Sequence, residues 1–194
     1  EADHAAIALG GGLNTTNGST IDLDNAALFV SQGTSLTDTV LSADKSVAIL
    51  GGGNTVEALA GLALQGAQGD FTAEELKNKL ADIVKGSGDT KLNNSTLTAT
   101  AGSLIGAASG LGAVDSTVTV EKSGMLVAGN MGLDKSAVDA DFAAVALGGG
   151  LTGTDSTVDL DSSALFVGMG TELTDSELSA DKSIAILGGG NTVE

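Results

Sequence analysis

An internal repeat of about 20 residues constrains this chain more than any other feature, because a unit this short must stack on its neighbours to bury a core. The unit is clearest at 156–175, STVDLDSSALFVGMGTELTD, and 19–38 repeats it as STIDLDNAALFVSQGTSLTD. Further copies occupy 1–18 (shortened), 39–57, 95–115, 116–135, 136–155 and 176–194.

Two segments of each unit have the pattern of a β-strand. In the first, 157–161, apolar Val158 and Leu160 alternate with polar residues, as in a strand with one buried face. The second, 164–167, is apolar throughout, which predicts a strand covered on both faces. A glycine-rich turn closes most units, where we expect backbone conformations that only glycine adopts easily. The pattern predicts a mainly β fold, a β-solenoid (parallel β-helix) of about eight coils of roughly 20 residues.

A longer period lies over the short one. Residues 34–57 and 171–194 match at 20 of 24 positions, and they lie 137 residues apart. The chain therefore resembles one super-repeat, 58–194, preceded by the end of another. We expect the native protein to carry further copies.

One stretch, 58–94, departs from the repeat and predicts a helical insertion. Thr72 and Glu75 fit a capping box, and Leu76, Leu80 and Ile83 lie on one face of the helix that follows. We expect this helix to cover part of the outer face of the second strands. The predicted organisation is solenoid coils over 1–57, the insertion over 58–94, and coils of the same rod over 95–194.

The composition excludes several classes of function. The net charge is −17 and all eight basic residues are lysines, which argues against nucleic-acid binding and against anionic membrane surfaces. We find no apolar run long enough to span a bilayer. The chain has one histidine, His4, and no cysteine, so the usual catalytic sets cannot be assembled. Its acidic residues recur from one repeat to the next, so they do not form one unique pair of catalytic carboxylates. We therefore expect no enzyme.

The strongest candidate for ligand chemistry is a column of acidic residues at the end of the first strand, with a second column two residues earlier. If the coils stack, these carboxylates lie about one strand spacing apart and repel one another, and Ca²⁺ would relieve that repulsion. Alternatively, each carboxylate caps its own turn, and neighbouring lysines screen it. The candidate metal ligands are Asp22, Asp24, Asp44, Glu121, Asp139, Asp141, Asp159, Asp161 and Asp181.

The apolar second strand predicts an assembly surface, because a strand with two apolar faces needs a cover beyond its own core. Unpaired strands at the ends of the solenoid could also template further coils. The predicted partners are copies of this chain, packed both laterally and along the axis. The candidate interface residues are Phe29, Ile49, Leu126, Phe166 and Ile186.

The units STVDLDSSALFVGMG and SADKSIAILGGGNTVE resemble the repetitive β-solenoid regions of large bacterial or archaeal surface proteins: haemagglutinin-like adhesins, sheath proteins and fibre proteins. The resemblance implies an extracellular or cell-surface, structural or adhesive role. It brings no catalytic or binding residues with it. The alternative is a calcium-dependent binding module that uses the stacked acidic column.

Overall fold

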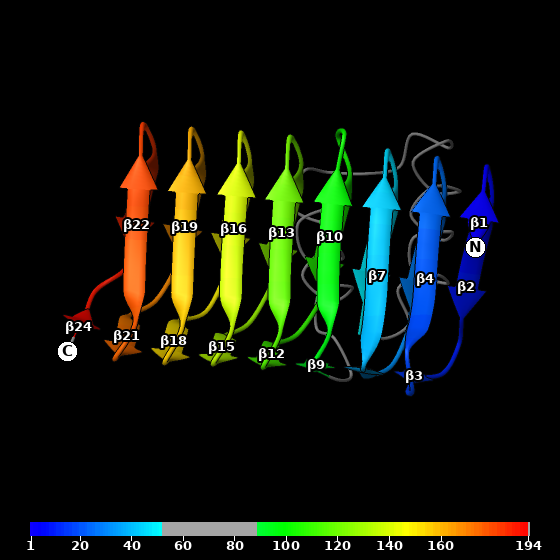
Figure 1. Cartoon of the computed structure of the whole chain (residues 1–194), viewed down its shortest axis with the longest axis horizontal. Coiled ribbons are helices and arrows are strands. Elements are labelled where there is room, and N and C mark those ends of the chain that lie inside the picture. The colour runs from blue at the N-terminus through cyan, green and yellow to red at the C-terminus, as the bar shows by residue number, and fades with distance from the viewer. Residues whose placement is uncertain (52–88, 194) are drawn as a thin grey trace, which may run out of the picture.

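The computed structural model describes residues 1–51 and 89–193, which form a solenoid of three parallel β-sheets with eight strands in each sheet. Each coil of the chain contributes one strand to each sheet. The sheet that faces the viewer in Figure 1 is called sheet A below, and the other two are sheets B and C. The two termini lie at opposite ends of the row of coils. Neighbouring strands of one sheet are always separated in sequence by a strand of each of the other two sheets.

The strands of each sheet follow in the order in which they pair. Sheet A contains β1 (Ala2–Asp3), β4 (Ser19–Asp24), β7 (Thr39–Asp44), β10 (Thr96–Thr100), β13 (Thr117–Glu121), β16 (Ala137–Asp141), β19 (Thr157–Asp161) and β22 (Glu177–Asp181). Sheet B contains β2 (Ala6–Leu9), β5 (Ala27–Val30), β8 (Val47–Leu50), β11 (Leu104–Ala107), β14 (Gly124–Val127), β17 (Ala144–Leu147), β20 (Ala164–Val167) and β23 (Ile184–Leu187). Sheet C contains β3 (Leu13–Thr15), β6 (Thr34–Thr37), β9 (Thr90–Asn93), β12 (Leu111–Val114), β15 (Met131–Asp134), β18 (Leu151–Thr154), β21 (Thr171–Thr174) and β24 (Thr192–Val193).

The expected solenoid is confirmed, but each coil has three strands instead of two. The third strand, such as Thr171–Thr174, carries inward-facing Thr171 and Leu173 and outward Glu172. Its inward column includes threonines and glycine, so the sequence lacks a clean apolar alternation there. The path from β1 to β22 makes seven turns, and the eight strands of each sheet correspond to eight coils.

The expected helical insertion over 58–94 is wrong as a feature of the fold, because the described residues contain no helix. Thr90–Asn93, assigned to that insertion, form β9 in sheet C. Thr90 and Leu92 of β9 are buried, whereas Lys91 and Asn93 are exposed. The remainder of the predicted insertion, including the helix proposed after Thr72, lies outside the described residues.

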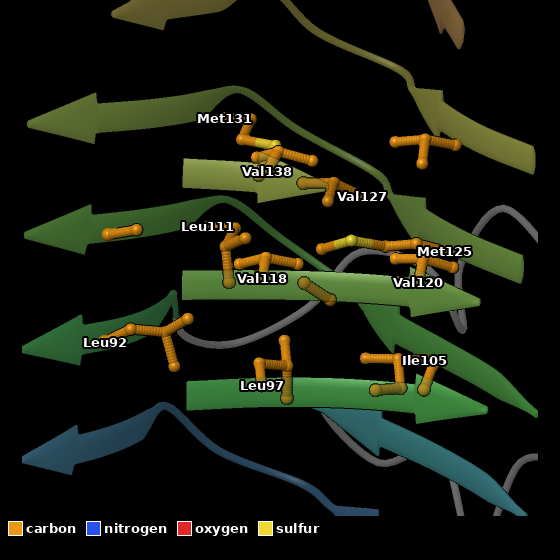
Figure 2. Close-up of a cluster of buried hydrophobic side chains, with 14 of the residues drawn as sticks. Leu92, Leu97, Ile105, Leu111, Val118, Val120, Met125, Val127, Met131 and Val138 are labelled. Atoms are coloured by element: carbon orange, nitrogen blue, oxygen red, sulfur yellow. The ribbon is translucent and has the colours of Figure 1, made fainter. Parts of the chain in front are cut away.

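The core consists of side chains from all three sheets that stack on their counterparts one coil away. Figure 2 shows one such column, formed by Leu97, Val118 and Val138 of sheet A. The predicted inward residues Val158 and Leu160 are buried, which confirms the alternation of the first strand. In the inner coils the same column carries the same burial, and small residues such as Ala99 and Ala140 fit the narrow interior. In the last strand, β22, Leu178 is only half-buried and Ala180 is exposed.

Two of the three corners in each coil turn at a non-glycine residue in the left-handed region, with φ between 46° and 63°, and at Asn17 and Ala101 the following glycine also has positive φ. Asparagine and aspartate tolerate this region better than most residues, yet lysines and a phenylalanine also occupy it here. The corner between sheets A and B uses His4, Asn25, Lys45, Ala101, Lys122, Phe142, Ser162 and Lys182. The corner between sheets C and A uses Asn17, Asp38, Asn94, Asp115, Lys135, Asp155 and Asp175.

Buried hydroxyl groups connect these corners from coil to coil. The backbone N–H of Ser116 donates to Ser136 Oγ at 3.1 Å, and Ser136 Oγ donates to the Asp134 carbonyl at 2.8 Å. Equivalent N–H to Oγ bonds join the corner before sheet A in successive coils, at Thr39, Ser95, Ser116, Ser136, Ser156 and Ser176. These serine ladders satisfy backbone groups that the strands leave unpaired.

The third corner is rich in glycine, above all after β17, β20 and β23, and close stacking is the main reason there. Ala108 and Ala128 hold the first position of this corner in two earlier coils. A Cβ added to Gly168 would lie 2.7 Å from the Gly148 carbonyl oxygen, and Gly150 faces the same limit at the carbonyl of Gly170. Among the glycines of this corner that the structure describes, Gly51 and Gly190 alone have positive φ. The expectation that these glycines are needed for their backbone angles therefore holds at few of them.

The long period corresponds to five coils. Strands β6, β7 and β8 of the first matching segment are equivalent to β21, β22 and β23 of the second, and β7 and β22 lie five steps apart in sheet A. Residues 52–88 connect β8 to β9, within a coil and between sheets B and C. β6 pairs with β9, and β7 pairs with β10. The strands before and after this segment therefore continue the same sheets.

Candidate functional site

The structure brings the predicted acidic residues together on the outer face of sheet A. Asp141 lies in register with Asp161, which lies in register with Asp181. The inner column is shorter, with Asp139 beside Asp159. Near the N-terminus, Asp24 pairs in register with Asp3 and Asp44, Thr100 interrupts the column, and Glu121 resumes it before Asp141, while Asp22 lies beside Ser42.

Lysines at the adjoining corner neutralise part of this charge. Lys122 Nζ lies 2.8 Å from Glu121 Oε1, and the hydrogen bond and charge of that carboxylate raise the pKa of Lys122. Lys182 lies 3.1 Å from Asp181, and Lys45 lies 3.6 Å from Asp44. All three ion pairs are exposed, which agrees with the screening role that the sequence allows for these lysines.

The column does not gather into a compact ligand set. In residues 1–51 and 89–193, no three histidine, aspartate or glutamate side chains converge closely enough to hold a metal ion. Asp44 Oδ1 and Asp141 Oδ1 are the carboxylate oxygens that are shielded from solvent without a hydrogen bond. His4 is exposed at a corner beside Asp3, and its counterpart Phe142 is exposed too. A surface role for His4 therefore fits better than catalysis.

A shallow groove of about 580 Å³ lies along sheet C and the glycine corner. Gly112 and Gly132 leave its floor without side chains, and Asp89 and Lys91 lie at one end. Asp89 Oδ1 accepts hydrogen bonds from Ser109 Oγ at 2.8 Å and from the Gly110 N–H at 3.1 Å, and these bonds lower the pKa of Asp89. The groove contains one cation and one anion and no cluster of groups suited to catalysis.

Sheet B presents the most uniform surface of the molecule. Its strands, as described, contain only Ala, Val, Ile, Leu, Met, Phe and Gly. Alternate residues face inward, so Leu165 and Val167 are buried while Ala164 and Phe166 are exposed. In the inner coils, the second and fourth residues of each strand build the core, and the first and third residues form an outer face without a single polar side chain. In the end strands β2 and β23, Ile7 and Ala185 are exposed, and in β11 Gly106 is buried beneath Ile49.

The predicted interface residues all lie in one column on this outer face. Leu126, Phe166 and Ile186 are 46%, 50% and 54% exposed, and Phe29 and Ile49 are half-buried. The expectation that 164–167 is covered on both faces is therefore wrong for the described chain. The strand is apolar on both sides, but only its inner side packs against the core.

Sequence reasoning missed the second outward column of sheet B, formed by the first residue of each strand. It includes exposed Leu104 and Ile184, with Gly124 and Ala164 between them. The signal was present, since the first and third residues are often one large and one small: Ala27 with Phe29, Leu104 with Gly106, Gly124 with Leu126, and Ala164 with Phe166. It becomes visible only when both residues are known to face outward.

No protein-family model, curated protein or solved structure matches this chain. Within the described ranges, the structure has no helix of the length and hydropathy needed to cross a membrane.

Proposed function

We propose that this chain is a structural repeat module of an extracellular fibre, sheath or large surface adhesin, and that it associates with copies of itself. The observation that carries the proposal is the outer face of sheet B. A continuous apolar face on a rod is a typical site of protein–protein contact. Leu126, Phe166 and Ile186 project from it while every coil behind them is already packed.

The charge distribution supports association through this face. The chain carries a net charge of −17, so two copies repel each other in most orientations. Asp139, Asp141, Asp159 and Asp161 lie on sheet A, away from the strands of sheet B. A pair that meets through sheet B brings together the faces that carry no carboxylate.

The extracellular location and the fibre-like role rest on the repeat pattern and its resemblance to surface solenoids. Axial association is a second predicted route, since β1 and β22 are edge strands of sheet A in the described structure. The apolar outer face of sheet B favours side-by-side contact between copies, whether or not the edge strands at the ends of the solenoid also associate. The experiment below therefore targets the outer face of sheet B.

Sedimentation velocity over a range of concentrations tests the proposal. The wild-type chain is expected to self-associate, and the double variant Leu126→Ser, Phe166→Ser is expected to sediment as a monomer, because both side chains are exposed and outside the core. The matched control is Val40→Ser, Val114→Ser, which removes two exposed apolar side chains from sheets A and C. A monomeric wild-type chain, or equal loss of association in both double variants, would contradict the proposal.

We keep the calcium-binding module as a second candidate because one observation favours it. The shielded oxygens Asp44 Oδ1 and Asp141 Oδ1 lie in the acidic column and have no hydrogen-bond partner. A bound cation would supply the missing partner and reduce repulsion between stacked carboxylates. The candidate requires that Ca²⁺ raise the melting temperature and that EDTA reverse the increase; a melting temperature unaffected by either would rule it out.

A further inference from the structure

We propose that the partner of sheet B is a second copy of this chain, packed parallel and in coil register, with a two-fold axis that runs along the solenoid. This inference rests on the proposed lateral association and specifies its geometry. In such a pair, coil faces coil, and the strands of the two facing sheets run in opposite directions. The first outward residue of a strand then faces the third outward residue of the same strand in the partner copy.

Side-chain size on the outer face is self-complementary under this operation. Phe166 of one copy would meet Ala164 of the other, and Leu126 would meet Gly124. The same large-to-small match arises at Ala27 with Phe29. At Gly106 the hollow is already filled by the preceding coil, since a Cβ there would lie 2.9 Å from Ile49 Cδ1. Matching protrusions to hollows is what dense packing between two sheets requires.

In the remaining coils, the first and third outward residues of a strand are similar in size. The two-fold operation therefore brings residues of similar size together there. Ala144 and Ala146 are small at both outward positions, as are Ala6 and Ala8. Ile184 and Ile186 are large at both positions, and so are Val47 and Ile49. Small coils lie directly before the coils that carry Phe29 and Phe166, which leaves room for the aromatic rings.

Charge at the edges favours the parallel arrangement over the antiparallel one. Lys45, Lys122 and Lys182 lie at the corner that precedes sheet B, in three separate coils of the eight, and each is paired with a carboxylate. In the parallel pair, this corner faces the partner corner that follows sheet B, where the corresponding residues are uncharged: Gly51, Ala128 and Gly188. A two-fold axis along the strands would instead place the lysine-bearing corners of both copies at the same edge, where like charges meet that the neighbouring carboxylates only partly neutralise.

The area is sufficient for a specific contact. Eight strands at about 4.8 Å and four residues at about 3.3 Å give a face of about 500 Å² per copy, or about 1,000 Å² in total. About 1,000 Å² is the lower limit for a specific protein–protein interface. Further super-repeats in register would add to this area coil by coil.

Transposing two side chains tests the contact. In the proposed pair, residues 164 and 166 of opposite copies meet, so the double variant Ala164→Phe, Phe166→Ala keeps one ring opposite one methyl group. We expect it to dimerise within about threefold of wild type, whereas Ala164→Phe alone places ring against ring and weakens association by about tenfold or more. Loss of association in the transposed variant, with its melting temperature unchanged, would overturn the inference.

A spin-label distance tests the direction independently and separates this inference from the proposed function. The chain has no cysteine, so Lys182→Cys carries one label in the last coil. The parallel pair predicts a separation of about 20 Å between the two labelled positions, and an antiparallel pair predicts about 35 Å. A dimer with the longer distance would overturn the parallel geometry and leave lateral association standing. A chain that stays monomeric, with Phe166 held against its own residues, would overturn both.

Discussion

At the scale of single residues, the serines do more than the composition suggests. Ser136 and Ser156 are buried, and each uses its hydroxyl twice, once as acceptor from the preceding coil and once as donor to a carbonyl two residues earlier. A buried hydroxyl with both roles filled fixes the coil spacing at the corner. The printed sequence shows the serine that begins most units, but its inward direction and its partner are consequences of stacking.

We predict that Ser136→Ala destabilises the fold by about 1–3 kcal/mol, because the N–H of Ser116 loses its acceptor inside the protein. Equilibrium denaturation in urea measures the change. Thr157→Ala, an exposed hydroxyl on sheet A, is the control and is expected to cost less than about 0.5 kcal/mol. Equal stability of the two variants would show that the ladder does not support the corner.

Asp89 gives a prediction about pH. Its pKa is lowered in the folded chain by the hydrogen bonds from Ser109 and Gly110, so the folded state is favoured while the carboxylate is charged. This contribution is complete above the unfolded pKa of about 3.9 and is lost as the pH falls through the lower folded value. At pH 6 the free energy of unfolding should therefore be slightly higher for wild type than for Asp89→Asn, by less than about 1 kcal/mol because the group is exposed, and the difference should shrink as the pH falls below the unfolded pKa. A constant difference across this range would contradict the assignment.

At the scale of elements, the glycine corner limits how closely coils approach. Gly148, Gly168 and Gly188 occupy equivalent positions, and a Cβ on each would meet the backbone of the coil before it. The strands on either side keep their register only if this corner stays narrow.

We therefore predict that Gly168→Ala destabilises the chain by about 1 kcal/mol, since an added Cβ would lie 2.7 Å from the Gly148 carbonyl oxygen and the two coils must separate slightly. Ala128 holds the equivalent position two coils earlier, so we expect the corner to accommodate the methyl group without unfolding. Gly189→Ala is the control, because a Cβ there has no neighbour within 4 Å. Thermal unfolding of both variants measures the difference. Comparable melting temperatures would mean that the corner opens freely.

The strands of sheets A and B could be predicted from the sequence because their inward residues are apolar and regular, as at Val158, Leu160, Leu165 and Val167. The third strand could not, because Thr171 in its core column and Gly112 or Gly132 on its surface have the composition of a turn. The acidic columns and the outward interface column were predicted by residue. The pairing of large with small residues was not, since it needs the knowledge that Ala164 and Phe166 share a face.

At the scale of the whole molecule, the three sheets divide the chemistry between them. Sheet A carries the stacked carboxylates, sheet C carries a mixed polar surface and a glycine-lined groove, and sheet B carries only apolar side chains. The super-repeat returns this arrangement every five coils, or about 24 Å along the axis. A longer chain of such repeats would therefore present a continuous apolar stripe beside a continuous acidic one.

Site-directed photocrosslinking of the full chain tests the central claim most directly. A benzophenone amino acid replaces Phe166 on sheet B in one variant, Val40 on sheet A in a second and Val114 on sheet C in a third, all three being exposed positions. If sheet B is the contact between copies, irradiation gives a covalent dimer from position 166 and little from positions 40 and 114. Dimers that form equally from all three positions, or none from position 166, would contradict the account.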